Sequence, residues 1–142
     1  MKYLSVKPAA IEHLLQAGIN GQSANLFMNT GPIFAVCDAD SYFPEEKLVF
    51  LAGGTIRWPG TIDVWMNICG DFKSYVNGPR VVRTLLESMI VSLDLHSLLM
   101  YVDATNEKAI RFSNWLGFEE RGRLEGFGPD RQDYLVMFRR VN

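Results

Sequence analysis

The strongest local signal in the chain is the stretch Asn106-Glu107-Lys108-Ala109-Ile110-Arg111-Phe112-Ser113-Asn114-Trp115-Leu116-Gly117-Phe118. Asn106 is among the residues preferred at a helix N-cap, and Glu107 puts a negative charge at the positive end of the helix dipole. Gly117 ends the helix, because glycine readily adopts the left-handed conformation that follows many helices. The stretch therefore predicts a helix that Asn106 caps and that runs to Leu116.

A longer helix and a buried strand precede this stretch. Gly78-Pro79 begins the helix, since proline is tolerated in the first helical turn. Apolar residues recur at helical spacing, which is typical of a helix that covers a sheet. They are Val81, Val82, Leu85, Leu86, Met89, Ile90 and Leu93. The run Leu98-Leu99-Met100-Tyr101-Val102 is almost wholly apolar, as expected of a strand covered on both faces.

The rest of the chain indicates short strands separated by turns. We expect strands at residues 2–6, 32–37, 48–57, 61–69, 119–126 and 133–140. A helix that Pro8 opens and Gly18 ends is expected after the first strand, and a second short helix is expected at residues 24–28. In the strand at 61–69 the side chains alternate, so Asp63 shares a face with Trp65.

Length and composition favour a single domain, residues 1–142, since this length suffices for one hydrophobic core. The net charge of -2 gives no electrostatic support for binding nucleic acid, and no apolar run approaches the roughly 20 residues of a membrane span. The first residues are too polar for a signal peptide, which favours a cytoplasmic location. Cys37 and Cys69 are interpreted as buried free thiols, because neither has a histidine nearby in the sequence. No metal site is therefore expected.

The run from Asn106 to Phe118 resembles the C-terminal motif of the GNAT family of N-acyltransferases, in which an Asn opens a helix that ends in Gly-Phe. The order of expected elements, β-α-α-β-β-β-α-β-α-β-β, agrees with that family over nearly the whole chain. The resemblance implies an α+β protein with a GNAT-like, three-layer α/β/α fold. Its central sheet would be mixed but mostly antiparallel, with about seven strands flanked by helices.

Three further stretches resemble a phage-encoded branch of the family, similar to the internal virion proteins of short-tailed phages. They are Gly31-Pro32-Ile33-Phe34-Ala35, Trp58-Pro59-Gly60 and Asp63-Val64-Trp65. This second resemblance implies a protein of the host cytoplasm or of the virion.

The family resemblance implies binding of acetyl-CoA as a cosubstrate where the fourth and fifth strands separate, with the pyrophosphate on the N-terminus of the following helix. A helix start suits phosphate, because its backbone N–H groups are free and its dipole favours an anion. The implied cofactor residues are Met66, Asn67, Ile68, Lys73, Val76, Asn77, Gly78, Arg80 and, for the pantetheine arm, Asn106. Val76 stands where the family has a glycine, and Pro79 removes one N–H group. The implied partners are acetyl-CoA and an unidentified amine or protein acceptor, and a homodimer is compatible with the family.

Two residues are candidates for catalysis. Asp63 occupies the fourth strand, where the family carries a carboxylate base, and its neighbour Trp65 is expected to desolvate it and raise its pKa. A solvated strand aspartate explains Asp63 equally well. Ser113 stands four residues before Gly117, where the family carries a tyrosine that protonates the departing thiolate. A serine hydroxyl is a poorer acid, and Tyr101 or Tyr134 are alternatives that the sequence does not place.

These observations leave three functional hypotheses. The first is an acyl-CoA-dependent N-acyltransferase that transfers the acetyl group of acetyl-CoA to an amine. The second is a catalytically inactive phage protein of the same fold that acts in virion assembly or host interaction, as Val76 and Ser113 suggest. The third is a regulator that binds CoA without turnover.

Overall fold

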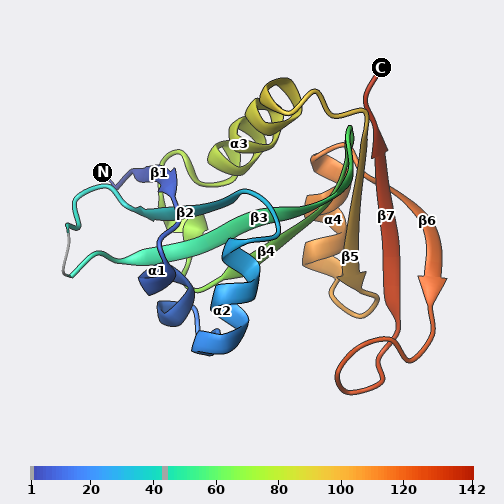
Figure 1. Cartoon of the computed structure of the whole chain (residues 1–142), viewed down its shortest axis with the longest axis horizontal. Coiled ribbons are helices and arrows are strands. Elements are labelled where there is room, and N and C mark those ends of the chain that lie inside the picture. Colours follow the sequence, from blue (N-terminus) through green and yellow to red (C-terminus); the bar gives the residue numbers. More distant parts are fainter. Residues whose placement is uncertain (1, 43–44) are drawn as a thin grey trace.

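The structure of the chain is a computed structural model that describes residues 2–42 and 45–142. Its elements follow the expected order (Figure 1). They are β1 (Leu4–Pro8), α1 (Ile11–Gln16), α2 (Gly21–Met28), β2 (Ile33–Asp38), β3 (Leu48–Trp58), β4 (Thr61–Ile68), the short 3₁₀ helix η1 (Phe72–Ser74), α3 (Gly78–Ser92), β5 (Ser97–Asp103), α4 (Glu107–Trp115), β6 (Glu119–Leu124) and β7 (Tyr134–Arg140).

The strands form one seven-stranded sheet in the order β1-β2-β3-β4-β5-β7-β6. Every neighbouring pair is antiparallel except β4 and β5, which are parallel. This parallel pair is joined by α3, as expected because parallel strands need a long crossover. The prediction of an α+β protein with a mixed, mostly antiparallel sheet of about seven strands is confirmed.

Buried side chains gather on both faces of the sheet. On one face α3 and α4 pack against the strands, with Phe50, Leu98 and Phe118 at the centre. On the other face α1 and α2 cover β2 and β3, and Leu14 and Leu51 are fully buried there. The sheet thus lies between two layers of helices (Figure 1). No helix of residues 2–42 and 45–142 is long and apolar enough to cross a membrane.

Two expectations at the ends of strands were wrong. Pro8 does not open a helix but ends β1, where it pairs with Phe34. β1 is an edge strand, and an edge tolerates a proline because one side of the strand needs no ladder hydrogen bonds. Cys69 is exposed rather than buried, because β4 ends at Ile68 and the chain then leaves the sheet toward η1.

Candidate functional site

The two parallel strands diverge after a short ladder. Its three residue pairs are Thr61–Ser97, Ile62–Leu98 and Asp63–Leu99, and no further pair joins β4 to β5 in the part of the chain that the structure describes. β4 continues to pair with β3 as far as Ile68. Its opposite edge therefore presents backbone groups that no strand pairs with, over a stretch that includes the predicted residues Met66, Asn67 and Ile68.

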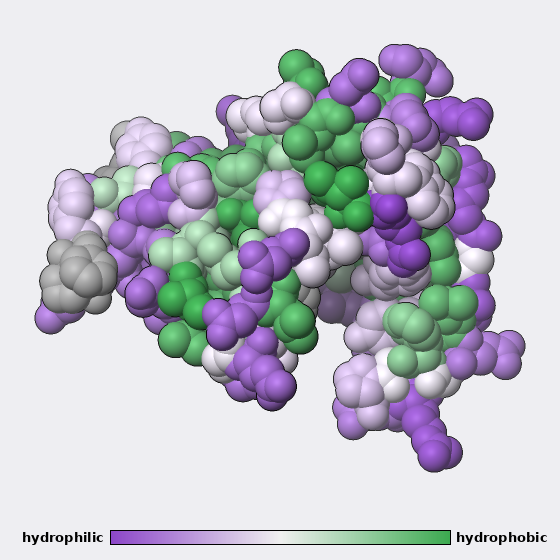
Figure 2. All heavy atoms as spheres, in the orientation of Figure 1, coloured by the Kyte–Doolittle hydropathy of each residue, from purple (hydrophilic) through white to green (hydrophobic). Residues whose placement is uncertain are grey.

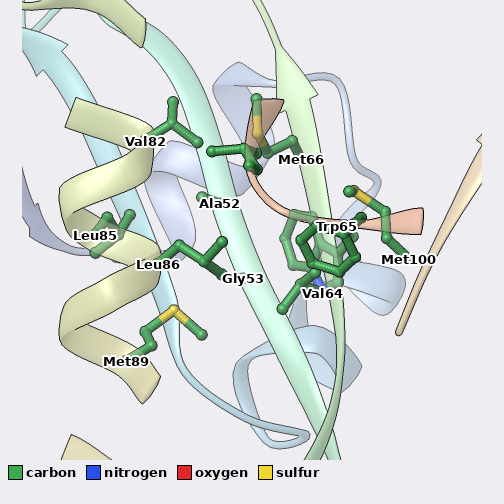
Figure 3. A pocket seen from close by; sticks show the side chains of 12 residues that line it. Ala52, Gly53, Val64, Trp65, Met66, Val82, Leu85, Leu86, Met89 and Met100 are labelled. Atoms are coloured by element: carbon green, nitrogen blue, oxygen red, sulfur yellow. The ribbon is translucent and has the colours of Figure 1, made fainter. Parts of the chain in front are cut away.

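A cleft of about 800 Å³ lies at this divergence. It is lined by Trp65, Met66, Ile68, Lys73, Met100, Tyr101, Val102, Asp103, Asn106, Lys108, Ala109, Arg111, Phe112, Ser113, Leu116 and Tyr134. A smaller apolar crevice of about 40 Å³ lies between α3 and the splayed strands, and Trp65 and Met100 border both spaces (Figure 3). The space-filling view shows the surface hollowed between α2 and the loop that joins β6 to β7 (Figure 2).

The large cleft passes through the sheet from one face to the other. Along β5, Met100 and Val102 belong to the core under α3 and α4. Tyr101 and Asp103 point to the opposite face, because side chains alternate along a strand. All four residues line the cleft. Two molecules can therefore reach the same gap from opposite sides of the sheet.

Three positive charges line the cleft. Lys73 comes from η1 and Lys108 and Arg111 come from α4, and all three are exposed. None of them takes part in an ion pair with any described residue. Unpaired cations around a concave site favour an anionic ligand, and phosphate groups are suited to lysine and arginine.

Most of the polar groups at the start of α3, where the phosphates were predicted to bind, already form hydrogen bonds within the protein. The N–H of Val76 donates to the carbonyl of Lys2, and the N–H of Gly78 donates to the carbonyl of Tyr75. The Asn77 side chain accepts from the N–H of Leu4 at 2.8 Å and donates to its carbonyl at 3.1 Å.

These bonds change what the helix start can offer a phosphate. Lys73 lines the cleft, whereas Val76, Asn77, Gly78 and Arg80 lie outside the set of lining residues. Val76 keeps a negative φ, so its bulk does not strain the backbone, yet its N–H group is already used. The side chains of the cleft, rather than this loop, hold most of the unused capacity for an anion.

Ser113 and Asn106 line the cleft on α4, and both have structural partners. Ser113 is 1% exposed, and its hydroxyl donates to the carbonyl of Ile110 at 2.8 Å. This bond uses the only proton that Ser113 could give to a substrate. Asn106 caps α4, because its Oδ1 accepts from the N–H of Ala109 at 3.1 Å. Its side-chain nitrogen makes no hydrogen bond to the described residues and remains available to a ligand.

Asp63 is held by an arginine from the neighbouring strand. Its Oδ2 lies 2.6 Å from a guanidinium nitrogen of Arg57. The Asp63 side chain is 17% exposed, and its Oδ1 is buried with no hydrogen bond to the described residues. The pKa of Arg57 is raised by Asp63 first and, to a smaller extent, by the nearby Tyr101. Asp63 shares a face with Trp65 as expected, and the charged side chain that contacts it is that of Arg57.

Tyr101 connects this pair to the cleft, which Asp63 itself does not line. Its ring stacks on Phe127 with centroids 5.8 Å apart, and Phe127 contacts Tyr134 edge-on at 5.6 Å. Asp103 lies opposite Tyr134 in the ladder between β5 and β7. The face of the cleft opposite α4 is therefore built from aromatic rings, two phenol hydroxyls and one carboxylate.

Sequence reasoning named Tyr101 and Tyr134 without placing them and missed Asp103, Lys108 and Arg111. One signal was present: Tyr101 and Asp103 are alternate residues at the end of an otherwise apolar strand. Lys108 and Arg111 are three residues apart on the helix that Asn106 caps, so they share its exposed side. Phe127 had no such signal, because it lies in a loop.

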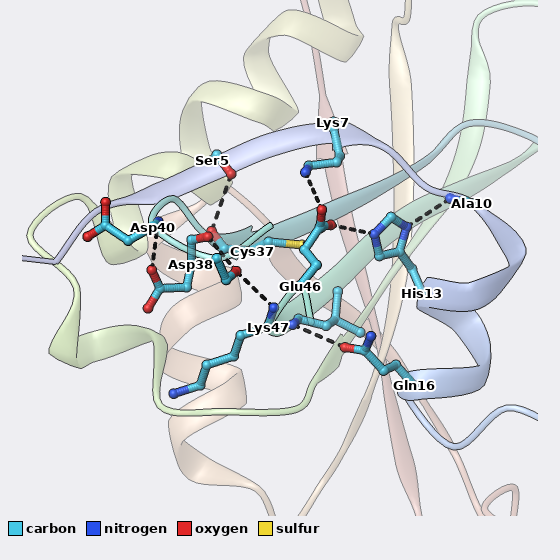
Figure 4. Close-up of polar contacts among 12 residues, drawn as sticks. Ser5, Lys7, Ala10, His13, Gln16, Cys37, Asp38, Asp40, Glu46 and Lys47 are labelled. Carbon is cyan, nitrogen blue, oxygen red and sulfur yellow. Dashed lines mark hydrogen bonds and ion pairs between the residues drawn. The ribbon is translucent and has the colours of Figure 1, made fainter. Parts of the chain in front are cut away.

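A second cluster of titratable side chains lies beneath α1, away from the cleft (Figure 4). Glu46 contacts Lys7 at 2.6 Å, His13 at 2.6 Å and the Cys37 thiol at 3.1 Å. Ligand atoms of His13, Cys37 and Glu46 lie within 4.8 Å of one another, although no histidine is near Cys37 in the sequence. Burial is the largest cause and the hydrogen bond with Glu46 is the next, and together they raise the pKa of Cys37 to about 12, so the thiol stays protonated.

The tautomer of His13 indicates hydrogen bonding rather than metal ligation in this cluster. Its Nδ1 accepts from the N–H of Ala10 at 2.9 Å, so in the neutral ring the proton is on Nε2. Nε2 then donates to Glu46. A metal on Nε2 would move the proton to Nδ1, where it would face another N–H donor. The cluster therefore ties α1 to the loop before β3.

Replacing Glu46 with Gln should destabilise the protein by about 2 kcal/mol at neutral pH, the typical value of a hydrogen bond to a charged group. Hydrogen bonds from Lys7, Cys37 and His13 lower the pKa of Glu46 from 4.5 to about 2. The contribution is thus full above about pH 4.5 and is lost as the pH falls toward 2. Urea unfolding of both proteins should show a difference that shrinks below pH 4.5. The exposed neighbour Glu45, replaced by Gln, is the matched control, and an equal loss in both variants would contradict the assignment.

Comparison with known proteins supports the fold. No protein-family model matches the chain, and no curated protein matches it in sequence. Among solved structures, a spermidine N-acetyltransferase chimera from Vibrio cholerae and hSSAT is similar, with a TM-score of 0.74 and 18% identity over 96% of this chain and 95% of that one. A ribosomal-protein-S5-alanine acetyltransferase from Vibrio fischeri is also similar, with a TM-score of 0.76 and 14% identity over 99% of this chain and 94% of that one. The structural neighbours are thus N-acetyltransferases, and at these identities the likeness shows a GNAT-like fold.

Proposed function

We propose that the chain is an acyl-CoA-dependent N-acyltransferase that transfers the acetyl group of acetyl-CoA to an amine. The observation that carries the proposal is the cleft, which crosses the sheet where β4 and β5 diverge and is bordered by three cations that form no ion pair with the described residues. Acetyl-CoA combines an extended arm of amide groups with several phosphates. An unpaired strand edge next to unpaired cations suits both parts of such a molecule.

The proposed cofactor residues follow from this arrangement. The pantetheine arm lies along the free edge of β4 at Met66, Asn67 and Ile68 and is met by the side-chain nitrogen of Asn106. The phosphates lie toward Lys73, Lys108 and Arg111. The segment of Val76, Asn77, Gly78 and Arg80, which runs into the start of α3, is proposed to border the phosphates and to contribute less, because the N–H groups of Val76 and Gly78 already have partners.

In the transfer step the acceptor nitrogen attacks the carbonyl carbon of the thioester. A C–N bond forms, the C–S bond breaks, the nitrogen loses a proton and the departing thiolate gains one. The attacking nitrogen must be neutral, yet only about 0.04% of an amine with a pKa of about 10.4 is neutral at pH 7. A group that moves protons in the cleft therefore speeds the reaction.

We assign this proton transfer to Tyr101, which lines the cleft and lies beside Arg57. Tyr101 gives its phenolic proton to the thiolate and recovers one from the acceptor nitrogen directly or through water. Asp63 is proposed to act through Arg57, because their ion pair holds the guanidinium next to Tyr101. Ser113 is proposed to stabilise the packing of α4 rather than to supply the acid.

Replacing Ser113 with Ala should therefore change the rate of acetyl transfer by less than about threefold, since only a hydrogen bond within the helix is lost. That bond contributes about 0.5–1.5 kcal/mol, so a small loss of thermal stability is expected. Steady-state release of free thiol and a thermal melt would check both values. If the rate of acetyl transfer falls more than about 100-fold while the variant stays folded, Ser113 would be the general acid.

Titration calorimetry with acetyl-CoA, followed by thiol release in the presence of amines, tests the proposed function. We expect binding in the micromolar range and release of thiol that depends on the amine. Absence of binding at millimolar acetyl-CoA would overturn the proposal. Binding without thiol release from any amine would favour a CoA-binding regulator.

The inactive phage protein is the second candidate function. It is favoured by two observations. The N–H groups of Val76 and Gly78 already donate hydrogen bonds within the protein, and the Ser113 hydroxyl is bonded within its own helix. This candidate predicts no turnover and the presence of the protein in virus particles. Mass spectrometry of purified particles would test it, and turnover of acetyl-CoA would count against it.

A further inference from the structure

The two faces of the cleft differ in charge, and this difference bears on the unidentified acceptor. Lys108 and Arg111 of α4 line one side of the cleft, where the phosphates are proposed to bind. Tyr101, Tyr134 and Asp103 line the opposite face. We propose that the acceptor is a small amine carrying a second cationic group, which Asp103 binds next to the rings of Tyr101 and Tyr134. This inference rests on the proposed acyl transfer, because it concerns the second substrate of the same cleft.

Asp103 is suited to a cation because it stays ionised and keeps acceptor capacity. The backbone N–H and then the hydroxyl of Thr105, both bonded to Oδ1, lower the pKa of its carboxyl. Among the described residues, its Oδ2 accepts only a long bond of 3.4 Å from Gln132. A carboxylate has about four positions for hydrogen bonds, so Oδ2 can accept from an ammonium group as well.

The aromatic rings add a second attraction for a cation. Tyr134 lies directly across from Asp103 on the neighbouring strand, and Tyr101 precedes Asp103 by two residues on the same face of β5. Phe127 bridges the two tyrosine rings at 5.8 and 5.6 Å and is 57% exposed. A ring face attracts an ammonium group by about 0.5–2 kcal/mol, depending on how far the group is desolvated.

The arginines near this face are already neutralised, which argues against an anionic acceptor. Arg57 is paired with Asp63 at 2.6 Å, and Arg123 is paired with Asp133 at 2.8 Å. No lysine or arginine on the side of β5 that carries Tyr101 lines the cleft among the described residues. A carboxylate on the acceptor would therefore meet Asp103 without a compensating charge.

Three amines of equal chain length test the proposal. 1,4-Diaminobutane carries a second cation, 1-aminobutane carries none, and 4-aminobutanoate carries an anion. We expect kcat/KM for thiol release to be at least about tenfold higher with the diamine than with the monoamine, the effect of one charge-assisted hydrogen bond. We expect the amino acid to be the poorest acceptor. Equal values for all three amines, or a preference for the amino acid, would overturn the proposal.

Variants test whether Asp103 causes the preference for the diamine. Asp103→Asn keeps an acceptor for Thr105 but removes the charge, so the ratio of diamine to monoamine should fall about tenfold. Asp130→Asn, in the exposed β6–β7 loop, is the matched control and should keep the ratio. An unchanged ratio in Asp103→Asn, or an equal fall in both variants, would contradict the role of Asp103. If Asp103→Asn does not fold, Tyr134→Ala tests the same ratio through the ring.

Hydroxylamine separates failure of this inference from failure of the proposed function. It is a small, uncharged nucleophile and needs no cation site. Thiol release with hydroxylamine above the rate without protein, but no preference for the diamine, would refute only the acceptor class. Absence of thiol release with every nucleophile, despite binding of acetyl-CoA, would refute the acyl transfer as well.

Discussion

Replacing Tyr101 with Phe should lower kcat for acetyl transfer about 100-fold, the lower end of what a general acid or base contributes. The substitution keeps the ring that stacks on Phe127 at 5.8 Å and removes only the hydroxyl. Binding of acetyl-CoA should therefore be unchanged, and the loss should appear in kcat rather than in KM. Steady-state thiol release and calorimetry on the same preparation separate the two quantities.

Two other tyrosines make this prediction specific. Tyr134 places a second hydroxyl in the cleft, so a larger loss in Tyr134→Phe than in Tyr101→Phe would reassign the proton transfer. Tyr42 is 75% exposed between β2 and β3, and Tyr42→Phe controls for the loss of a surface hydroxyl. If kcat falls less than about threefold in Tyr101→Phe, Tyr101 does not transfer the proton. This face of the cleft would then contribute only binding and orientation of the substrates.

The fold was predictable because its elements carry periodic patterns. The apolar stripe from Val81 to Leu93 and the capped run from Asn106 to Phe118 specify their helices locally, without help from the rest of the chain. The error at Pro8 arose because only the strand order reveals that β1 is an edge, where a proline is tolerated. Similarly, α2 begins three residues before its expected start at Ala24, since Gly21 lacks the propensity that marks a helix.

The site was less predictable because its contacts join distant segments. Arg57 and Asp63 come together through a hairpin, but their link to Tyr101 depends on the parallel pairing of β4 with β5. The contact between Glu46 and His13 spans 33 residues and depends on the loop before β3. Neither contact follows from spacing along the chain. The closeness of Asn106 and Ser113 was predictable, because Asn106 caps the helix on which Ser113 lies.

Neutralising all three cleft cations, in Lys73→Ala, Lys108→Ala and Arg111→Ala combined, should weaken binding of CoA about 100-fold. Each charge-assisted contact to phosphate contributes about 1.5–3 kcal/mol when well formed, but exposure and salt screening reduce this value at the surface. We therefore expect each single variant to weaken CoA binding about tenfold, and the three effects to add incompletely in the triple variant. Calorimetry at two salt concentrations should show that the wild type loses more affinity with added salt than the triple variant does.

Two comparisons decide where the phosphates bind. S-acetylpantetheine carries the thioester arm without the nucleotide phosphates, so its affinity should be the same for the wild type and the triple variant. Arg80→Ala tests the start of α3, where the N–H groups of Val76 and Gly78 already have partners and the side chain of Asn77 is bonded to Leu4. A greater loss in Arg80→Ala than in the triple variant would show that the phosphates bind at this helix start despite its internal bonds. The opposite order would mean that side-chain cations of the cleft take the place of the backbone donors of Val76 and Gly78, which this chain bonds to the carbonyls of Lys2 and Tyr75.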